Sequence, residues 1–208
     1  MKTLYIILIL FINLTLLGQN NCNCGKFYDD ILQEPDTIIV INNDISFAIC
    51  GYFEKDFVSE FTLTRCGETK ILDFYGAVLN YKITLDNDTL KLIDFRILSD
   101  DLKNYENTPW AIDMYYLNNE KIEHKRRVVY EKNLSLNYNS EFQNVWDNEI
   151  KSDWSDNQKL IHWTWLISLN NNEVYENYFL NYRKVFKIGG ANAELYSELK
   201  RMYIEYKK

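Results

Sequence analysis

Glycine and proline are scarce in this chain, with 7 glycines and 2 prolines among 208 residues. None of the glycines forms the G-x-G-x-x-G or P-loop spacing that holds a phosphate with backbone N–H groups. The G-x-S-x-G turn that presents a catalytic serine is missing as well. The sequence therefore lacks the signatures of dinucleotide-binding enzymes, P-loop enzymes and hydrolases with that turn.

Histidine and positive charge are also in short supply. The 2 histidines, His124 and His162, are too few for a three-histidine zinc site. Lys and Arg number 23 against 30 Asp and Glu, which gives a net charge of −7. A nucleic-acid-binding protein needs a basic surface. We therefore expect no nucleic-acid partner, no metal and no cofactor.

The N-terminus is an apolar segment from Leu4 to Leu17 that follows a single Lys2. Its length, about 14 residues, is shorter than the ~20 that a membrane-spanning helix needs. Gly18 and a polar stretch follow it, which is typical of a secretory signal peptide. We predict a signal peptide at residues 1–18, a periplasmic or secreted protein, and no membrane span after cleavage. The alternative is an uncleaved anchor or a buried N-terminal element.

Four cysteines remain in the mature chain: Cys22, Cys24, Cys50 and Cys66. An even number in an exported chain indicates disulfides. A lipid on Cys22 would leave an odd thiol, and the C-x-C spacing fits zinc poorly because zinc sites use C-x2-C. A Cys22–Cys24 bridge would close a strained ring. Each of the two should therefore join Cys50 or Cys66, and the choice between the two pairings stays open.

Apolar and polar residues alternate with period two through the first two thirds of the chain, which predicts strands joined by short turns in an antiparallel meander. The expected strands are Ile45–Phe53, Phe57–Leu63, Thr69–Tyr75, Ala77–Leu85, Thr89–Leu98, Trp110–Leu117 and Lys121–Leu136. A turn centred on Lys55 would place Cys50 opposite Glu60, and Cys66 opposite Asp44.

After Tyr138 the apolar period becomes helical, and about four helices are predicted. The expected helical segments are 140–150, Leu160–Leu169, Val174–Val185 and Leu195–Tyr206; the second would also suit a strand because of its Ile, Thr and Trp content. Strands followed by helices indicate an α+β fold. We predict one domain at 19–208, mainly β over 36–138 and mainly α over 140–208, with the helices packed on the sheet.

Two short motifs offer candidate ligand contacts. His162, Trp163 and Trp165 lie in an apolar segment, and with Trp154 they could form a stacking platform for a sugar. Two indoles so close together on a helix pack more often in a core, which is the interpretation we favour.

The second motif is the basic run Lys125, Arg126 and Arg127 beside His124. The three cations should favour a neutral imidazole near pH 7. We interpret the run as a strand edge kept charged to prevent edge pairing. A docking patch for an anionic surface is the alternative.

The sequence therefore predicts an exported binding or interaction protein with no catalytic residue that we can name. Its expected partner is another protein or an envelope component, in the manner of an inhibitor, an immunity-type protein or a structural component. The alternative is a carbohydrate-binding or carbohydrate-processing protein that uses the aromatic residues of its C-terminal half.

Overall fold

The computed structural model describes residues 22–25, 34–42, 45–76, 79–98, 105–119, 121–131, 154–169, 173, 176–177, 179–181 and 189–208. The chain divides into two compact units, which are described separately here. Unit 1 comprises residues 1–96 and 109–127, and unit 2 comprises residues 97–108 and 128–208. The signal peptide predicted at 1–18 lies outside the described residues.

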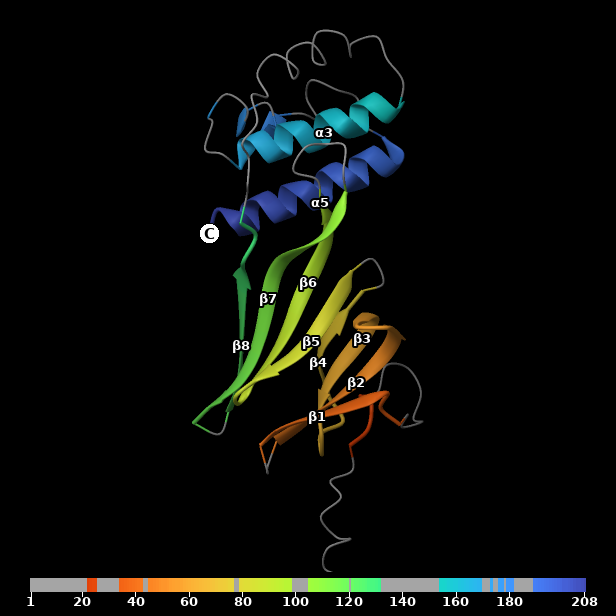
Figure 1. The fold of residues 1–208 in the computed structure, drawn as a ribbon, viewed down its shortest axis with the longest axis vertical. Helices are drawn as coiled ribbons and strands as arrows, with labels where there is room; N and C mark the ends of the chain where they lie inside the picture. The colour runs from red at the N-terminus through yellow and green to blue at the C-terminus, as the bar shows by residue number, and fades with distance from the viewer. Residues whose placement is uncertain are drawn as a thin grey trace, which may run out of the picture. The chain divides into compact units, whose positions relative to one another are not determined.

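An antiparallel sheet of eight strands dominates the N-terminal two thirds (Figure 1). Its strands are β1 (Thr37–Asn42), β2 (Ile45–Glu54), β3 (Phe57–Arg65), β4 (Ile71–Tyr75), β5 (Asn80–Asp86), β6 (Thr89–Leu98), β7 (Glu106–Asn118) and β8 (Lys121–Val128). The order is β1-β2-β3-β5-β6-β7-β8, and β4 pairs with β3. The last residues of β6 and the first residues of β7 belong to unit 2.

The sequence-predicted strands all have counterparts in this sheet, from β2 to β8. Two differences stand out. The sequence analysis missed β1, whose run of Thr, Ile and Val shows no alternation. The predicted last strand was too long, because β8 ends at Val128 and residues 129–131 are not strand; residues 132–136 lie outside the described residues.

The core of unit 1 is formed by side chains that alternate along the strands. Its buried members are Ile41, Ile45, Phe47, Ile49, Val58, Phe61, Leu63, Tyr75, Tyr81, Leu90, Leu92 and Tyr115. All of them come from strands, and the face that carries them is called the core face below. That helices cover this face stays a prediction.

The β2–β3 hairpin has a different register from the predicted one. Its turn contains two residues, because Glu54 pairs directly with Phe57. A bulge then inserts Glu60, whose φ is +46°, between the residues that pair with Gly51 and Tyr52. The two shifts together bring Cys50 opposite Thr62 instead of Glu60. Cys66 likewise lies beside Ser46, to whose carbonyl oxygen it donates its N–H at 2.9 Å, and not beside Asp44.

An N-terminal arm, residues 22–25, is fixed to this hairpin by two disulfides. Cys22 is joined to Cys66, and Cys24 to Cys50, so the prediction that each would reach one of the later cysteines is confirmed. Gly25 donates its N–H to Thr64 Oγ1 at 3.0 Å. The arm thus lies on the outer face of the sheet, opposite the core face, and this explains why Thr64 is fully buried there.

Unit 2 contains the helices. The described residues form three helices, not about four: α3 (Trp154–Ser168), α5 (Gly190–Tyr206) and a helical segment within 173–181. The first predicted helix, 140–150, lies outside the described residues. Leu160–Ser168 is helical, as favoured over a strand. Phe179 packs against Tyr196 of α5, whose hydroxyl donates to the Phe179 carbonyl oxygen at 2.9 Å.

The length and apolar character of the helices decide whether one of them could cross a membrane. Among the described residues, no helix is both long and apolar enough to cross a bilayer.

Gly51 provides the first prediction, because the bulged hairpin leaves no room for a side chain there. A Cβ at this position would lie 2.3 Å from Phe61 Cβ and 2.7 Å from the Glu60 carbonyl oxygen. We expect Gly51→Ala to lower the free energy of unfolding by ~1–3 kcal/mol, the range for overpacking. Gly76→Ala is the control, since no described atom lies within 4 Å of its added Cβ. Urea unfolding of both variants is the measurement; equal stabilities would contradict the described bulge.

Candidate functional site

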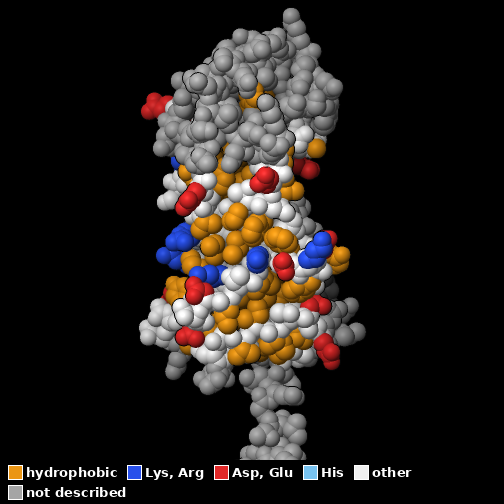
Figure 2. All heavy atoms as spheres, in the orientation of Figure 1, with side chains coloured by type: hydrophobic (Ala, Val, Ile, Leu, Met, Phe, Trp, Pro, Cys, Tyr) orange, Lys and Arg blue, Asp and Glu red, His pale blue; other side chains and the backbone are white. Residues whose placement is uncertain are grey.

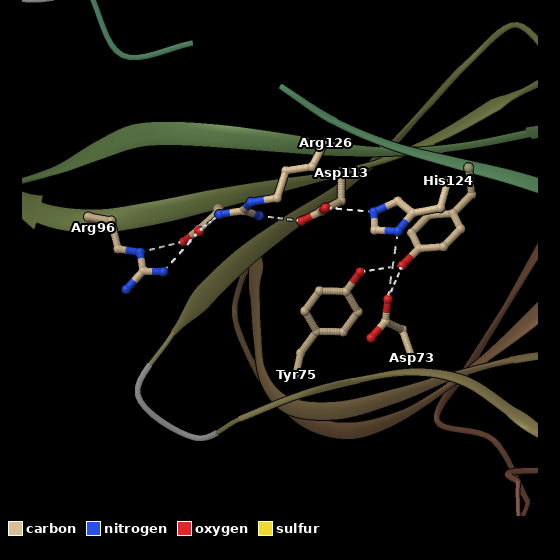
Figure 3. A network of polar contacts seen from close by, with 8 residues as sticks. Asp73, Tyr75, Arg96, Asp113, His124 and Arg126 are labelled. Atoms are coloured by element: carbon tan, nitrogen blue, oxygen red, sulfur yellow. Dashed lines mark hydrogen bonds and ion pairs between the residues drawn. The ribbon is translucent and has the colours of Figure 1, made fainter. Parts of the chain in front are cut away.

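Charged and hydroxyl side chains form one continuous network in unit 1 (Figure 3). Four strands contribute two residues each at alternate positions, which places both on one face of the strand. They are Asp73 and Tyr75 on β4, Asp94 and Arg96 on β6, Asp113 and Tyr115 on β7, and His124 and Arg126 on β8. Tyr75 and Tyr115 belong to the apolar core cluster, so the network lies on the core face.

Arg126 is the centre of the ionic part of this network. Its Nη2 lies 2.6 Å from Asp94 Oδ2, and its Nη1 lies 2.5 Å from Asp113 Oδ2. Arg96 makes two further contacts with Asp94, at 2.8 Å through Nε and at 3.1 Å through Nη2. Asp94 is 0% exposed and Asp113 is 2% exposed. Buried carboxylates of this kind are tolerated only when cations pair with them, and the guanidinium of Arg126 serves both.

His124 continues the network from Asp113 towards Asp73. Its Nε2 lies 2.7 Å from Asp113 Oδ1, and its Nδ1 lies 3.9 Å from Asp73 Oδ2. The imidazole also stacks on the ring of Tyr115, with the ring centres 4.5 Å apart and the planes nearly parallel. The hydrogen bond with Asp113 raises the pKa of His124, and the charges of Asp113 and Asp73 add to the effect.

The prediction that neighbouring cations favour a neutral His124 is therefore wrong, because the pKa of His124 is raised. Of the three neighbouring cations, Lys125 and Arg127 are exposed at the alternate positions of β8 and so lie on its other face. Only Arg126 shares the side of His124, and two carboxylates offset its charge. The carboxylates that face His124 come from other strands, which the local sequence does not reveal.

Two tyrosine hydroxyls end the network. Tyr115 donates to Asp73 Oδ2 at 2.9 Å. Because a hydroxyl has a single hydrogen, the contact of 2.5 Å between the two tyrosine oxygens requires Tyr75 to donate to Tyr115. Burial raises the pKa of Tyr75 and of Tyr115 well above the usual value, so both hydroxyls keep their protons at neutral pH.

The chemistry of this arrangement is that of a paired structural network. Three carboxylates face two guanidiniums and one imidazole, so the charges balance when His124 is protonated. Each carboxylate accepts from a guanidinium, the imidazole or a hydroxyl inside the network. Within the part of the chain that the structure describes, no group of three or more His, Cys, Asp and Glu side chains is placed to hold a metal ion.

One signal for this network is present in the sequence of β6 itself. Along β6, the buried phase reads Leu90, Leu92, Asp94, Arg96 and Leu98, so two charges occupy positions where the alternation calls for apolar residues. Charges in the apolar phase of a strand need partners in the core. The partners on β7 and β8 depend on strand pairing and could not be read from β6 alone.

The predicted ligand residues fall in the two separately described units. Arg126 belongs to the ionic network, whereas Lys125 and Arg127 are exposed on β8. His162, Trp163 and Trp165 lie on α3 in unit 2. The side chain of Trp154 lies outside the described residues.

The α3 motif is largely buried. Trp165 is fully buried and His162 is 7% exposed, while Trp163 is partly buried. Burial lowers the pKa of His162 to about 4, so its imidazole is neutral at pH 7. Tyr105 packs edge-on against it, with the ring centres 5.8 Å apart. Trp165 and His162 are therefore not available to a ligand at the surface.

Comparison with known proteins adds no relative: no protein-family model, no curated protein and no solved structure matches the chain.

The hydrogen bond between His124 and Asp113 generates the second prediction. A raised pKa means that the imidazolium stabilises the fold fully below the unfolded value of about 6.5, and that this contribution is lost as the pH rises through the folded pKa. We expect the His124 ring to titrate above about 6.5 in an NMR pH titration. Asp113→Asn should lower the midpoint because the hydrogen bond to a carboxylate is removed.

The matched control for this titration is Asp86→Asn, which changes an exposed carboxylate at the end of β5 that pairs with Lys91. This variant should leave the His124 midpoint where it is. A His124 midpoint at or below 6.5 in the unmodified protein would rule out the described contact with Asp113.

Proposed function

We propose that this chain is an exported protein that acts by binding another protein or an envelope component, without catalysis of its own. Two disulfides among the described residues fit an oxidising compartment such as the periplasm or the extracellular space. The polar network supports a non-catalytic role, because its carboxylates and guanidiniums are engaged with one another in the core. A binding function then requires a surface suited to a macromolecule.

The observation that carries the proposal is a group of exposed apolar side chains on the outer face of unit 1, which we name the outer patch. It consists of Ile38 and Val40 on β1 and Leu72 and Phe74 on β4, which are 51%, 55%, 38% and 51% exposed. Isolated exposed apolar residues are common in proteins, but a group on one face indicates an interaction surface. Figure 2 shows hydrophobic side chains gathered across the strands, including the margin where β1 lies.

The strand registers place this patch around the disulfide-bonded arm. Ile38 pairs with Ala48, Ala48 with Thr64, and Thr64 with Ile71. The arm lies over Thr64, so β1 flanks it on one side and β4 flanks it on the other. Two bridges anchor this arm and restrict the freedom of the unfolded chain. The patch is therefore built on a rigid base, which lowers the entropy lost when a partner binds.

The carbohydrate alternative has less support. A sugar-binding site needs exposed aromatic rings among polar groups in a groove. Trp165 and His162 are buried in unit 2, so that part of the predicted platform is covered by the protein itself. An apolar patch beside a fixed arm suits a protein surface better.

Site-specific photo-crosslinking in the native host tests this function. A photoreactive amino acid at Phe74 should give one discrete adduct with another protein, because the side chain at this position is exposed within the outer patch. The same group at Leu85 is the control, since this residue of β5 is 47% exposed but lies outside the patch.

Two further results decide the outcome of this experiment. Adding Leu72→Asp to the Phe74 probe should abolish the adduct, since a carboxylate would have to be buried against the partner. If Phe74 gives no adduct, or if Leu85 gives the same one, the outer patch is not the binding surface.

A further inference from the structure

The two ends of the sheet differ in chemistry. β8 ends the strand order on one side and carries the exposed cations Lys121, Lys125 and Arg127. Charges of this kind prevent a second chain from pairing with an edge strand. β1 ends the order on the other side and reads Thr-Ile-Ile-Val-Ile-Asn, without a charge. Among the residues that the structure describes, β1 pairs with β2 alone, so its second edge offers backbone groups to another strand.

The side chains of β1 alternate in a way that suits a joined sheet. Ile39 and Ile41 face the core, whereas Ile38 and Val40 lie on the outer face with about half of their surface exposed. A further strand paired with β1 would cover part of Ile38 and Val40 and would satisfy the backbone edge at the same time. One added strand would thus bury apolar surface and also form backbone hydrogen bonds, as in other cases of strand addition.

The sequence of β1 is also nearly symmetric about Ile39. In an antiparallel pair of two β1 strands centred on this residue, Ile39 faces its own copy and Ile38 faces Val40 of the second copy. The pairing of β1 with β2 is irregular between Val40 and Asn42, so the regular part of this contact is centred on Ile38, Ile39 and Val40, none of which is charged. This register also keeps the two core faces on one side of the joined sheet.

We propose that β1 pairs with β1 of a second copy of this chain, antiparallel about a twofold axis at Ile39. An isologous contact of this kind needs a self-complementary surface, and the near-symmetric uncharged strand supplies one. The net charge of −7 on each chain opposes association, but charges more than about 8 Å away are largely screened at physiological ionic strength. The inference rests on the proposed function and divides the outer patch. A second copy of the chain would cover Ile38 and Val40 on β1, and Leu72 and Phe74 on β4 would remain for the other protein.

Sedimentation velocity of the mature, disulfide-bonded chain tests the inference. The unmodified protein should sediment as a dimer that dissociates on dilution. Val40→Lys should sediment as a monomer, because its ammonium would face Ile38 of the second copy and lose its hydration. Leu85→Lys is the matched control: it adds the same charge at a residue of similar exposure on β5, which is not at an end of the strand order, and it should remain a dimer.

Ile38→Lys is the second variant and should also be a monomer, while thermal unfolding checks that each variant is folded. A protein that is monomeric at every soluble concentration would overturn the inference, and so would folded Val40→Lys and Ile38→Lys variants that both remain dimers. If a photoreactive group at Val40 crosslinks to a different protein and not to a second copy, the edge belongs to that protein and the inference is wrong.

The two proposals fail separately. A monomer whose Phe74 probe still crosslinks to another protein would remove the dimer and leave the proposed function standing. A dimer whose Phe74 probe gives no adduct would keep the β1 contact and remove the proposed function.

Discussion

The guanidinium of Arg126, placed between the buried carboxylates of Asp94 and Asp113, is the interaction on which the sheet of unit 1 most depends. Through side chains it joins β8 to β7, the strand beside it, and also to β6, which lies beyond β7 in the strand order. If β8 slipped by one residue, Arg126 would turn to the opposite face and two buried carboxylates would lose their cation. The network therefore selects one register for the last strand and fixes the end of the sheet.

This constraint also divides the charges of β8 between two roles. Alternation sends His124 and Arg126 to the core face, where they neutralise acids, and leaves Lys125 and Arg127 exposed on the other face. The exposed pair protects this edge against other strands. β1 has no such protection, and the outer patch lies next to it on the same unit. The surface that we propose for a partner thus lies at the N-terminal end of the sheet, where the disulfides make it rigid.

Much of the fold could be predicted from the sequence because period-two alternation reports directly on a strand with one buried face. β1 was not predicted, because its five consecutive β-branched residues show no period-two alternation. The register of the β2–β3 hairpin was predicted wrongly, because the alternation does not reveal the bulge at Glu60, where the chain packs closely against Gly51. The pairing of the disulfides followed from that register, so it could only be narrowed to two choices. The ionic network could not be predicted because it depends on how β6, β7 and β8 lie beside one another. The cations next to His124 in the sequence predicted a lowered pKa for this residue, whereas carboxylates from other strands raise it.

Native-state hydrogen exchange of Arg126→Met tests the central role of this side chain most directly. The variant keeps most of the side-chain volume but leaves Asp94 and Asp113 with fewer cationic partners in the core. We predict that the opening free energy of the β7 amides between Asp113 and Tyr115 falls by about 2–4 kcal/mol, somewhat below the ~3–5 for a fully buried pair because Arg126 is 27% exposed. The neighbouring Arg127→Met should leave these amides unchanged. Equal protection in both variants would contradict the account.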